Sequence, residues 1–146
     1  MRREHYPPER NQVPAHLTLF HHLPPGIEAE LVQRVKAATS AHSPLASIVG
    51  IIDLGGGTAF RAECPELAAI RADLADAFHG LLTPQDRAGW RPHVTIQNKV
   101  ADKEARALRQ RLRAGFEPRP LAIKGLAVWR YLGGPWEAVG EWSFRR

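Results

Sequence analysis

The 146-residue sequence has only one cysteine, Cys64, so no disulfide can form within the chain. A single thiol is typical of proteins in a reducing compartment, and we expect a cytoplasmic protein. Nothing beside Cys64 resembles the signature of a cysteine nucleophile. The chain also lacks a run of about 18 apolar residues, which a membrane-spanning helix needs. We therefore expect a chain that does not enter a membrane and that folds around a hydrophobic core without disulfides.

Residues 1–13 are polar and charged, and they lack the apolar segment of a secretory signal peptide. We expect them to form a flexible arm. The remaining residues, 14–146, suffice for one compact domain, which we expect to be a monomer. Twenty Lys and Arg against fifteen Asp and Glu give a net charge of +5. This charge favours a polyanionic partner, either nucleic acid or a phosphorylated small molecule, although many Ala- and Arg-rich chains are basic for other reasons.

The pattern of apolar residues divides the chain into two repeats with the same order of elements: strand, helix and β-hairpin. The first repeat covers residues 14–63, and its hairpin turns at the three glycines 55–57. The second repeat covers residues 91–145, and its hairpin turns at residues 133–135. A helix over 65–79 links the two repeats.

The spacing within the repeats supports this division. His16 and Gly56 are 56 − 16 = 40 residues apart, and His93 and Gly133 are 133 − 93 = 40 residues apart. A repeat of this length predicts two similar lobes related by a pseudo-twofold axis. We therefore predict an α+β fold with two pseudo-symmetric lobes, in which antiparallel-rich sheets flank a central cleft and helices lie outside.

Each repeat begins with a strand that carries a histidine and a threonine two residues apart. The first pair is His16 and Thr18, and the second is His93 and Thr95. Alternate residues of a strand point the same way, so each pair places an imidazole and a hydroxyl on one face, about 6.6–7 Å apart at the backbone. Across the pseudo-twofold axis, the four side chains would converge on one cleft.

Two histidines and two threonines suit phosphoryl chemistry. An imidazole with a pKa of about 6.5 can act as a base in one copy and as an acid in the other. Threonine hydroxyls can donate hydrogen bonds to non-bridging phosphate oxygens as negative charge develops on them. This chemistry requires no metal or other cofactor, and we expect none.

The tetrapeptides HLTL (residues 16–19) and HVTI (residues 93–96) resemble the paired His-x-Thr-x motifs of the 2H phosphoesterase superfamily, the 2'-5' RNA ligase-like proteins. The resemblance covers nearly the whole chain from Pro14 onward, including the segments WRPHVTIQNK and GGPWE. It implies a two-lobed α+β fold around a cleft. It also implies metal-independent action on 2',3'-cyclic or 2',5' phosphodiesters of RNA ends or nucleotides.

Carried over residue by residue, the resemblance implies that His16 and His93 are the catalytic acid–base pair and that Thr18 and Thr95 bind phosphate. By analogy, His93 deprotonates the water or attacking hydroxyl and His16 protonates the leaving oxygen, although the pseudo-symmetry leaves the reverse assignment open. Hydrolysis and ligation both remain open. One alternative is a non-catalytic module that binds RNA ends or nucleotides in the same cleft. Another is a protein-interaction domain in which the motifs are accidental.

Further residues are candidates for a substrate-binding rim around these four. Gln97 and Lys99 continue the face of the second motif, where they could contact phosphates. An arginine near a strand end could pair with phosphate, and a tyrosine could stack on a base. Packing or solvent exposure is the alternative role for each of the five candidates, which are Arg91, Gln97, Lys99, Arg130 and Tyr131.

Two other groups of side chains are less suggestive of a site. His21 and His22 are candidates for a metal site with the first motif, but adjacent strand residues point to opposite faces, so we expect no metal there. In the last strand, Trp136, Trp142 and Phe144 share one face, and we expect all three in the core.

Overall fold

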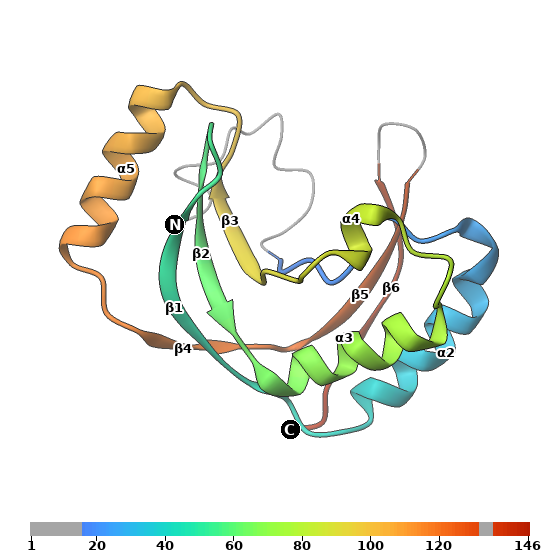
Figure 1. Cartoon of the computed structure of the whole chain (residues 1–146). Helices are drawn as coiled ribbons and strands as arrows, with labels where there is room; N and C mark the ends of the chain where they lie inside the picture. Colours follow the sequence, from blue (N-terminus) through green and yellow to red (C-terminus); the bar gives the residue numbers. More distant parts are fainter. Residues whose placement is uncertain (1–15, 132–135) are drawn as a thin grey trace. The chain divides into compact units, whose positions relative to one another are not determined.

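The computed structural model describes residues 16–131 and 136–146 (Figure 1). The predicted flexible arm, residues 1–13, and the predicted glycine turn at residues 133–135 lie outside the described residues. The chain divides into two compact units. Among the described residues, the first unit comprises His16–Thr18, Ser47–Glu63 and Arg91–Leu121. The second comprises Leu19–Ala46, Cys64–Trp90 and the described part of Ala122–Arg146.

A four-stranded sheet, in the order β3-β2-β1-β4, forms the centre of the first unit. Adjacent strands β1 and β2 are antiparallel, as are β2 and β3. The strands are β1 (Leu45–Asp53), β2 (Thr58–Glu63), β3 (His93–Gln97) and β4 (Arg119–Ala122).

The predicted hairpin around the first glycine cluster is confirmed, because β1 and β2 are joined by this turn. Gly55 adopts a φ of +87°, which is open to glycine at little steric cost. Its N–H donates to Asp53 Oδ1 at 2.7 Å, so the aspartate side chain stabilises the turn.

Helix α5 (Asp102–Ala114) covers one face of this sheet (Figure 1). Leu108 of α5 packs with Ile48, Phe60 and Ile96, which come from three different strands. All four side chains are buried, and burying a side chain of this size stabilises a fold by about 1.5–3 kcal/mol. The apolar periodicity of the sequence predicted this helix, which ends before Gly115.

The second unit contains the antiparallel pair β5–β6, against which helix α2 packs. The predicted helices of this unit are confirmed, and the linking helix ends at Ala77 instead of residue 79. Within the part of the chain that the structure describes, no helix is long and apolar enough to cross a membrane. The elements are η2 (Pro25–Ile27), α2 (Glu28–Thr39), α3 (Pro65–Ala77), α4 (Pro84–Arg87), β5 (Gly125–Tyr131) and β6 (Trp136–Ser143).

Two extended segments differ from the prediction. The run that follows α5 is split, so that β4 joins the four-stranded sheet while β5 pairs with β6. In the described part of the predicted first strand, pairing is limited to one antiparallel β-bridge between Leu17 and Val94. Further along this segment, the N–H groups of His21 and His22 donate to the carboxylate of Asp86.

Each compact unit takes elements from both predicted repeats. The first unit combines the β1–β2 hairpin with β3 and α5, whereas the second combines α2 with β5–β6. The predicted α+β fold with antiparallel strands is confirmed, and the four-stranded sheet is curled. The equivalence of two pseudo-symmetric lobes stays a prediction.

Gly57 lets the β1–β2 turn approach the end of β3. A Cβ atom at this position would clash with the carbonyl oxygen of Gln97 and would lie 2.9 Å from the Cα of Asn98. We expect Gly57→Ala to lower the free energy of unfolding by about 1–3 kcal/mol, measured by urea denaturation. Gly89→Ala is the matched control, because a Cβ there meets nothing within 4 Å. An equal decrease in the free energy of unfolding in the two variants would contradict the prediction.

Candidate active site

The β-bridge between Leu17 and Val94 brings the two His-x-Thr motifs onto neighbouring segments of the sheet. Each of these apolar residues is the middle residue of its motif. Side chains alternate between the faces of a strand, so the histidine and threonine of each motif point to the face opposite Leu17 and Val94. The motifs run antiparallel, and both belong to the first compact unit.

The four predicted residues form a two-by-two patch, which we call the His-Thr patch. Extending the register by one residue in each direction places Thr18 opposite His93 and His16 opposite Thr95. Each histidine therefore faces the threonine of the other motif. The two histidines lie on a diagonal, and diagonal neighbours of an antiparallel pair are about 7–8 Å apart at the backbone. At this spacing both side chains can reach one small ligand.

The His-Thr patch lies on the sheet face away from α5. Val94 pairs with Phe60, and Ile96 on the same face of β3 is buried in the core with Leu108 of α5. His93 and Thr95 alternate with these residues and point to the other face. His16 is exposed and the other three residues of the patch are half-buried, so a ligand in solvent can reach them.

The ring of His93 is oriented by the backbone. Its Nδ1 lies 2.8 Å from the carbonyl oxygen of Arg91. A carbonyl oxygen can only accept a hydrogen bond, so Nδ1 carries a proton and donates it. In the neutral ring the lone pair is then on Nε2. Neutral His93 can therefore take up a proton at Nε2.

Three of the predicted rim residues lie in the first unit and differ in exposure. Arg91 is exposed, and its carbonyl holds the His93 ring. Lys99 is also exposed and has a φ of 55°. The side chain of Gln97 is instead packed within the sheet: the residue is 4% exposed, and its Oε1 accepts a hydrogen bond from Thr58 at 3.4 Å. Burial leaves Gln97 little surface with which to meet a ligand.

Arg130 lies in the second unit, where carboxylates surround its guanidinium. Its Nε and Nη2 donate to the two carboxylate oxygens of Glu28 at 3.0 and 2.8 Å, and its Nη1 pairs with Glu137. The hydrogen bond from Arg130 lowers the pKa of the Glu28 carboxyl. Arg130 therefore joins α2 to the β5–β6 hairpin within this unit.

Tyr131, Trp136 and His22 form an exposed aromatic cluster in the same unit. The rings of Tyr131 and Trp136 meet edge to face with centroids 4.9 Å apart, and the His22 ring lies 6.4 Å from Tyr131. The prediction that Trp136 belongs to the core is wrong, because this residue is 40% exposed, whereas Phe144 is buried. Trp136 follows the predicted turn directly, and there its ring packs on Tyr131 at the surface.

A buried carboxylate, Asp86, holds the segment that follows the first motif. It is 2% exposed, and its two oxygens accept the N–H groups of His21 and His22 at 2.8 and 2.9 Å. Burial alone would raise the pKa of Asp86, but the hydrogen bonds from His21 and His22 outweigh burial and lower it. Arg71 donates to the carbonyl oxygens of Leu19 and Asp86 at 2.8 and 2.7 Å, which fixes the same segment from α3.

Asp86 lies between the linking helix and the second repeat, in a segment for which the sequence predicts no site. Its only local signal is the helix start at Thr83, whose side chain accepts the N–H of Asp86 at 3.3 Å. The pairing with His21 spans 65 residues, which no local pattern indicates. Over residues 16–131 and 136–146, no three His, Cys, Asp or Glu side chains form a group that could hold a metal ion.

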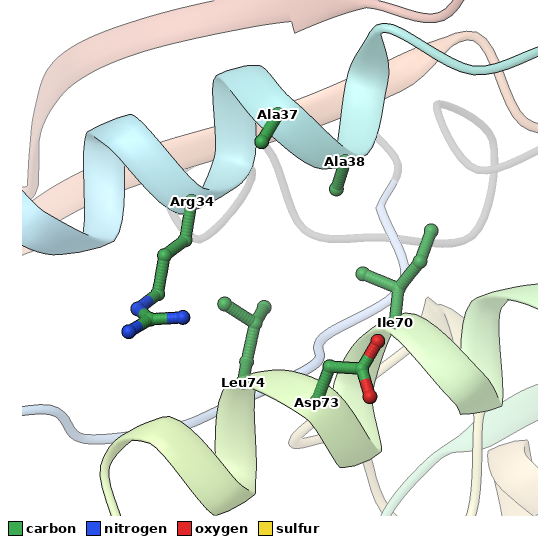
Figure 2. Close-up of a pocket in the computed structure, with 6 residues that line it drawn as sticks. All are labelled: Arg34, Ala37, Ala38, Ile70, Asp73 and Leu74. Carbon is green, nitrogen blue, oxygen red and sulfur yellow. The ribbon is translucent and has the colours of Figure 1, made fainter.

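A hollow of about 320 Å³ lies between α2 and α3 in the second unit (Figure 2). Its walls are mostly apolar, with one arginine on α2 and one aspartate on α3. This arginine, Arg34, already pairs with Glu30 at 2.8 Å. None of the predicted site residues lines the hollow, which is bounded by Arg34, Ala37, Ala38, Ile70, Asp73 and Leu74.

Comparison with known proteins identifies one family. A model of the 2'-5' RNA ligase superfamily matches residues 1–135, a range that includes both His-x-Thr motifs. A search of curated proteins gives no significant match.

Asp86 should make the stability of the fold depend on pH. Its folded pKa lies below the ordinary value of 3.8, so the ionised group stabilises the fold above that value, and this contribution disappears as the pH falls through the folded pKa. We expect Asp86→Asn to lower the free energy of unfolding by about 1–3 kcal/mol at pH 7. We also expect the variant to lose less stability than the wild type on acidification.

Urea denaturation between pH 3 and pH 7 measures both effects. Asp73→Asn is the matched control, because Asp73 is an exposed aspartate on α3 and we expect its substitution to change stability by less than about 0.5 kcal/mol. If the wild type and Asp86→Asn lose stability in parallel on acidification, the proposed role of the Asp86 carboxylate is wrong.

Proposed function

The chain belongs to the 2'-5' RNA ligase superfamily, as its paired motifs predicted, and from this premise we propose that it is a metal-independent phosphoesterase or ligase. Its proposed substrates are 2',3'-cyclic or 2',5' phosphodiesters of RNA ends or nucleotides. The observation that carries the proposal is the β-bridge between Leu17 and Val94. Its register groups two imidazoles and two hydroxyls in the His-Thr patch.

In the proposed hydrolysis, His93 is the base and His16 is the acid. Nε2 of neutral His93 takes a proton from the attacking water, and the water oxygen forms a bond to phosphorus. The bond from phosphorus to one ribose oxygen breaks, and this oxygen takes a proton from protonated His16. The products are a phosphomonoester and a free ribose hydroxyl. Proton exchange with solvent then restores both rings.

The diagonal placement of the histidines suits this displacement. The attacking and leaving oxygens lie on opposite sides of phosphorus, so the base and the acid must reach the phosphate from opposite sides. Thr18 and Thr95 occupy the other diagonal, where their hydroxyls can donate to the non-bridging oxygens. These donors stabilise the negative charge that grows on the oxygens in the transition state. In ligation, the histidines exchange roles.

The proposal predicts that both histidines are essential for turnover. We expect His16→Ala and His93→Ala each to lower kcat by about 10²–10⁴-fold, because each variant lacks one proton-transfer group. The wild type should show a bell-shaped dependence of kcat/KM on pH, since one ring must be neutral and the other protonated. His79→Ala is the matched control: His79 is an exposed histidine of the second unit, and its loss should leave turnover unchanged.

The substrates to test are 2',3'-cyclic nucleotides, RNAs with cyclic-phosphate ends and 2',5'-linked oligonucleotides, with the linkage of each product determined. Unchanged turnover in a folded His16→Ala or His93→Ala variant would refute the acid–base mechanism. Binding of a 2',3'-cyclic nucleotide without any product, even after long incubation, would instead favour the non-catalytic nucleotide-binding module.

A further inference from the structure

Arg61 of β2 is the cross-strand neighbour of His93. The register pairs Arg61 with His93 and Ala59 with Thr95. Directly paired residues of antiparallel strands point to the same face, with Cβ atoms about 4.5–5.5 Å apart. Arg61 therefore extends the row formed by Thr18 and His93, on the sheet face away from α5.

The next strand places a glycine beside this arginine. On its other side Arg61 pairs with Gly50 of β1. A Cβ atom built on Gly50 would lie 3.6 Å from Arg61 Nε and 3.8 Å from Arg61 Cβ, so the arginine side chain lies close over the glycine backbone. Because Gly50 has no side chain, the Arg61 side chain can lie against this part of the sheet.

The guanidinium of Arg61 is accessible and only loosely paired. Its side chain is 52% exposed, and its Nη2 lies 3.8 Å from Glu63 Oε1, which is longer than a hydrogen bond. Arg130, in contrast, binds both oxygens of Glu28, and Arg109 is buried against Asp53 and the carbonyl of Gly57. An exposed ion pair as long as that of Arg61 contributes little to stability, so an anionic ligand could replace Glu63 at small cost.

We propose that Arg61 binds a non-bridging phosphate oxygen of the substrate, next to His93 and Thr18. This inference rests on the proposed function and adds a phosphate-binding residue that the His-x-Thr motifs do not contain. A guanidinium is planar and always charged, and it can donate two hydrogen bonds to one phosphate. Arg61 would supply the positive charge that the hydroxyls of the two threonines cannot.

Arg61→Gln tests the proposal, because glutamine keeps a polar side chain but removes the charge. We expect it to weaken binding of a nucleoside 2'- or 3'-monophosphate by about 10- to 100-fold, measured by calorimetry. With 2',3'-cyclic nucleotides as substrates, KM should rise and kcat/KM should fall. Arg61→Lys should lose less affinity for the monophosphate than Arg61→Gln, because lysine keeps the positive charge but cannot form a bidentate pair with phosphate.

Arg106→Gln is the matched control, because it removes an exposed arginine from α5 and leaves the sheet face of Arg61 untouched. We expect it to leave binding and turnover unchanged. Circular dichroism and urea denaturation show whether each variant is folded. If Arg61→Gln does not fold, the affinity of Arg61→Lys for the monophosphate is compared with that of the wild type. A loss of at least about threefold supports the proposal, and a smaller loss contradicts it.

The inference and the proposed function can fail separately. If the wild type turns over the cyclic nucleotides and folded Arg61→Gln binds the monophosphate as tightly as the wild type, the inference is wrong and the proposed function stands. If the wild type binds the monophosphate through Arg61 but gives no product from any substrate, Arg61 is an anion-binding residue and the proposed catalysis is wrong. If the wild type neither binds nor reacts, both are wrong.

Discussion

The antiparallel pairing of Leu17 with Val94 is the contact on which the candidate site depends. An antiparallel pair has a local two-fold axis between its two residues, and here that axis relates the two histidines to each other and the two threonines to each other. The motifs alone therefore give both imidazoles equivalent positions. The two imidazoles differ in their surroundings. At His93, the Arg91 carbonyl fixes the ring, and Arg61 is the cross-strand neighbour.

The same pairing ties the chemistry of one sheet face to the core on the other. Val94 pairs with Phe60, and Phe60 packs with Leu108 of α5. A slip of one residue in the register would turn the histidine and threonine of a motif toward α5 and expose the apolar residues. The cost of burying an imidazole and a hydroxyl without partners opposes that slip. The apolar middle residues of the motifs thus help to keep the polar ones in place.

Local patterns in the sequence predicted the parts of this structure that depend on neighbouring residues. Apolar periodicity predicted α5, the glycines predicted the β1–β2 turn, and strand alternation grouped the histidine and threonine of each motif. Contacts between distant segments could not be read in this way. The pairing of Arg61 with His93 and the binding of His21 by Asp86 arise from tertiary folding, which spacing along the chain does not encode.

The β-bridge between the motifs also bears on when the site can form. Leu17 and Val94 are 94 − 17 = 77 residues apart, and the Asp86 contact that follows the first motif closes a loop of similar length. Contacts between residues so far apart in the sequence form only after the entropy cost of closing a long loop has been overcome. The proposed site therefore belongs to the late-forming part of the fold, and a partly folded chain can contain both motifs without having an active centre.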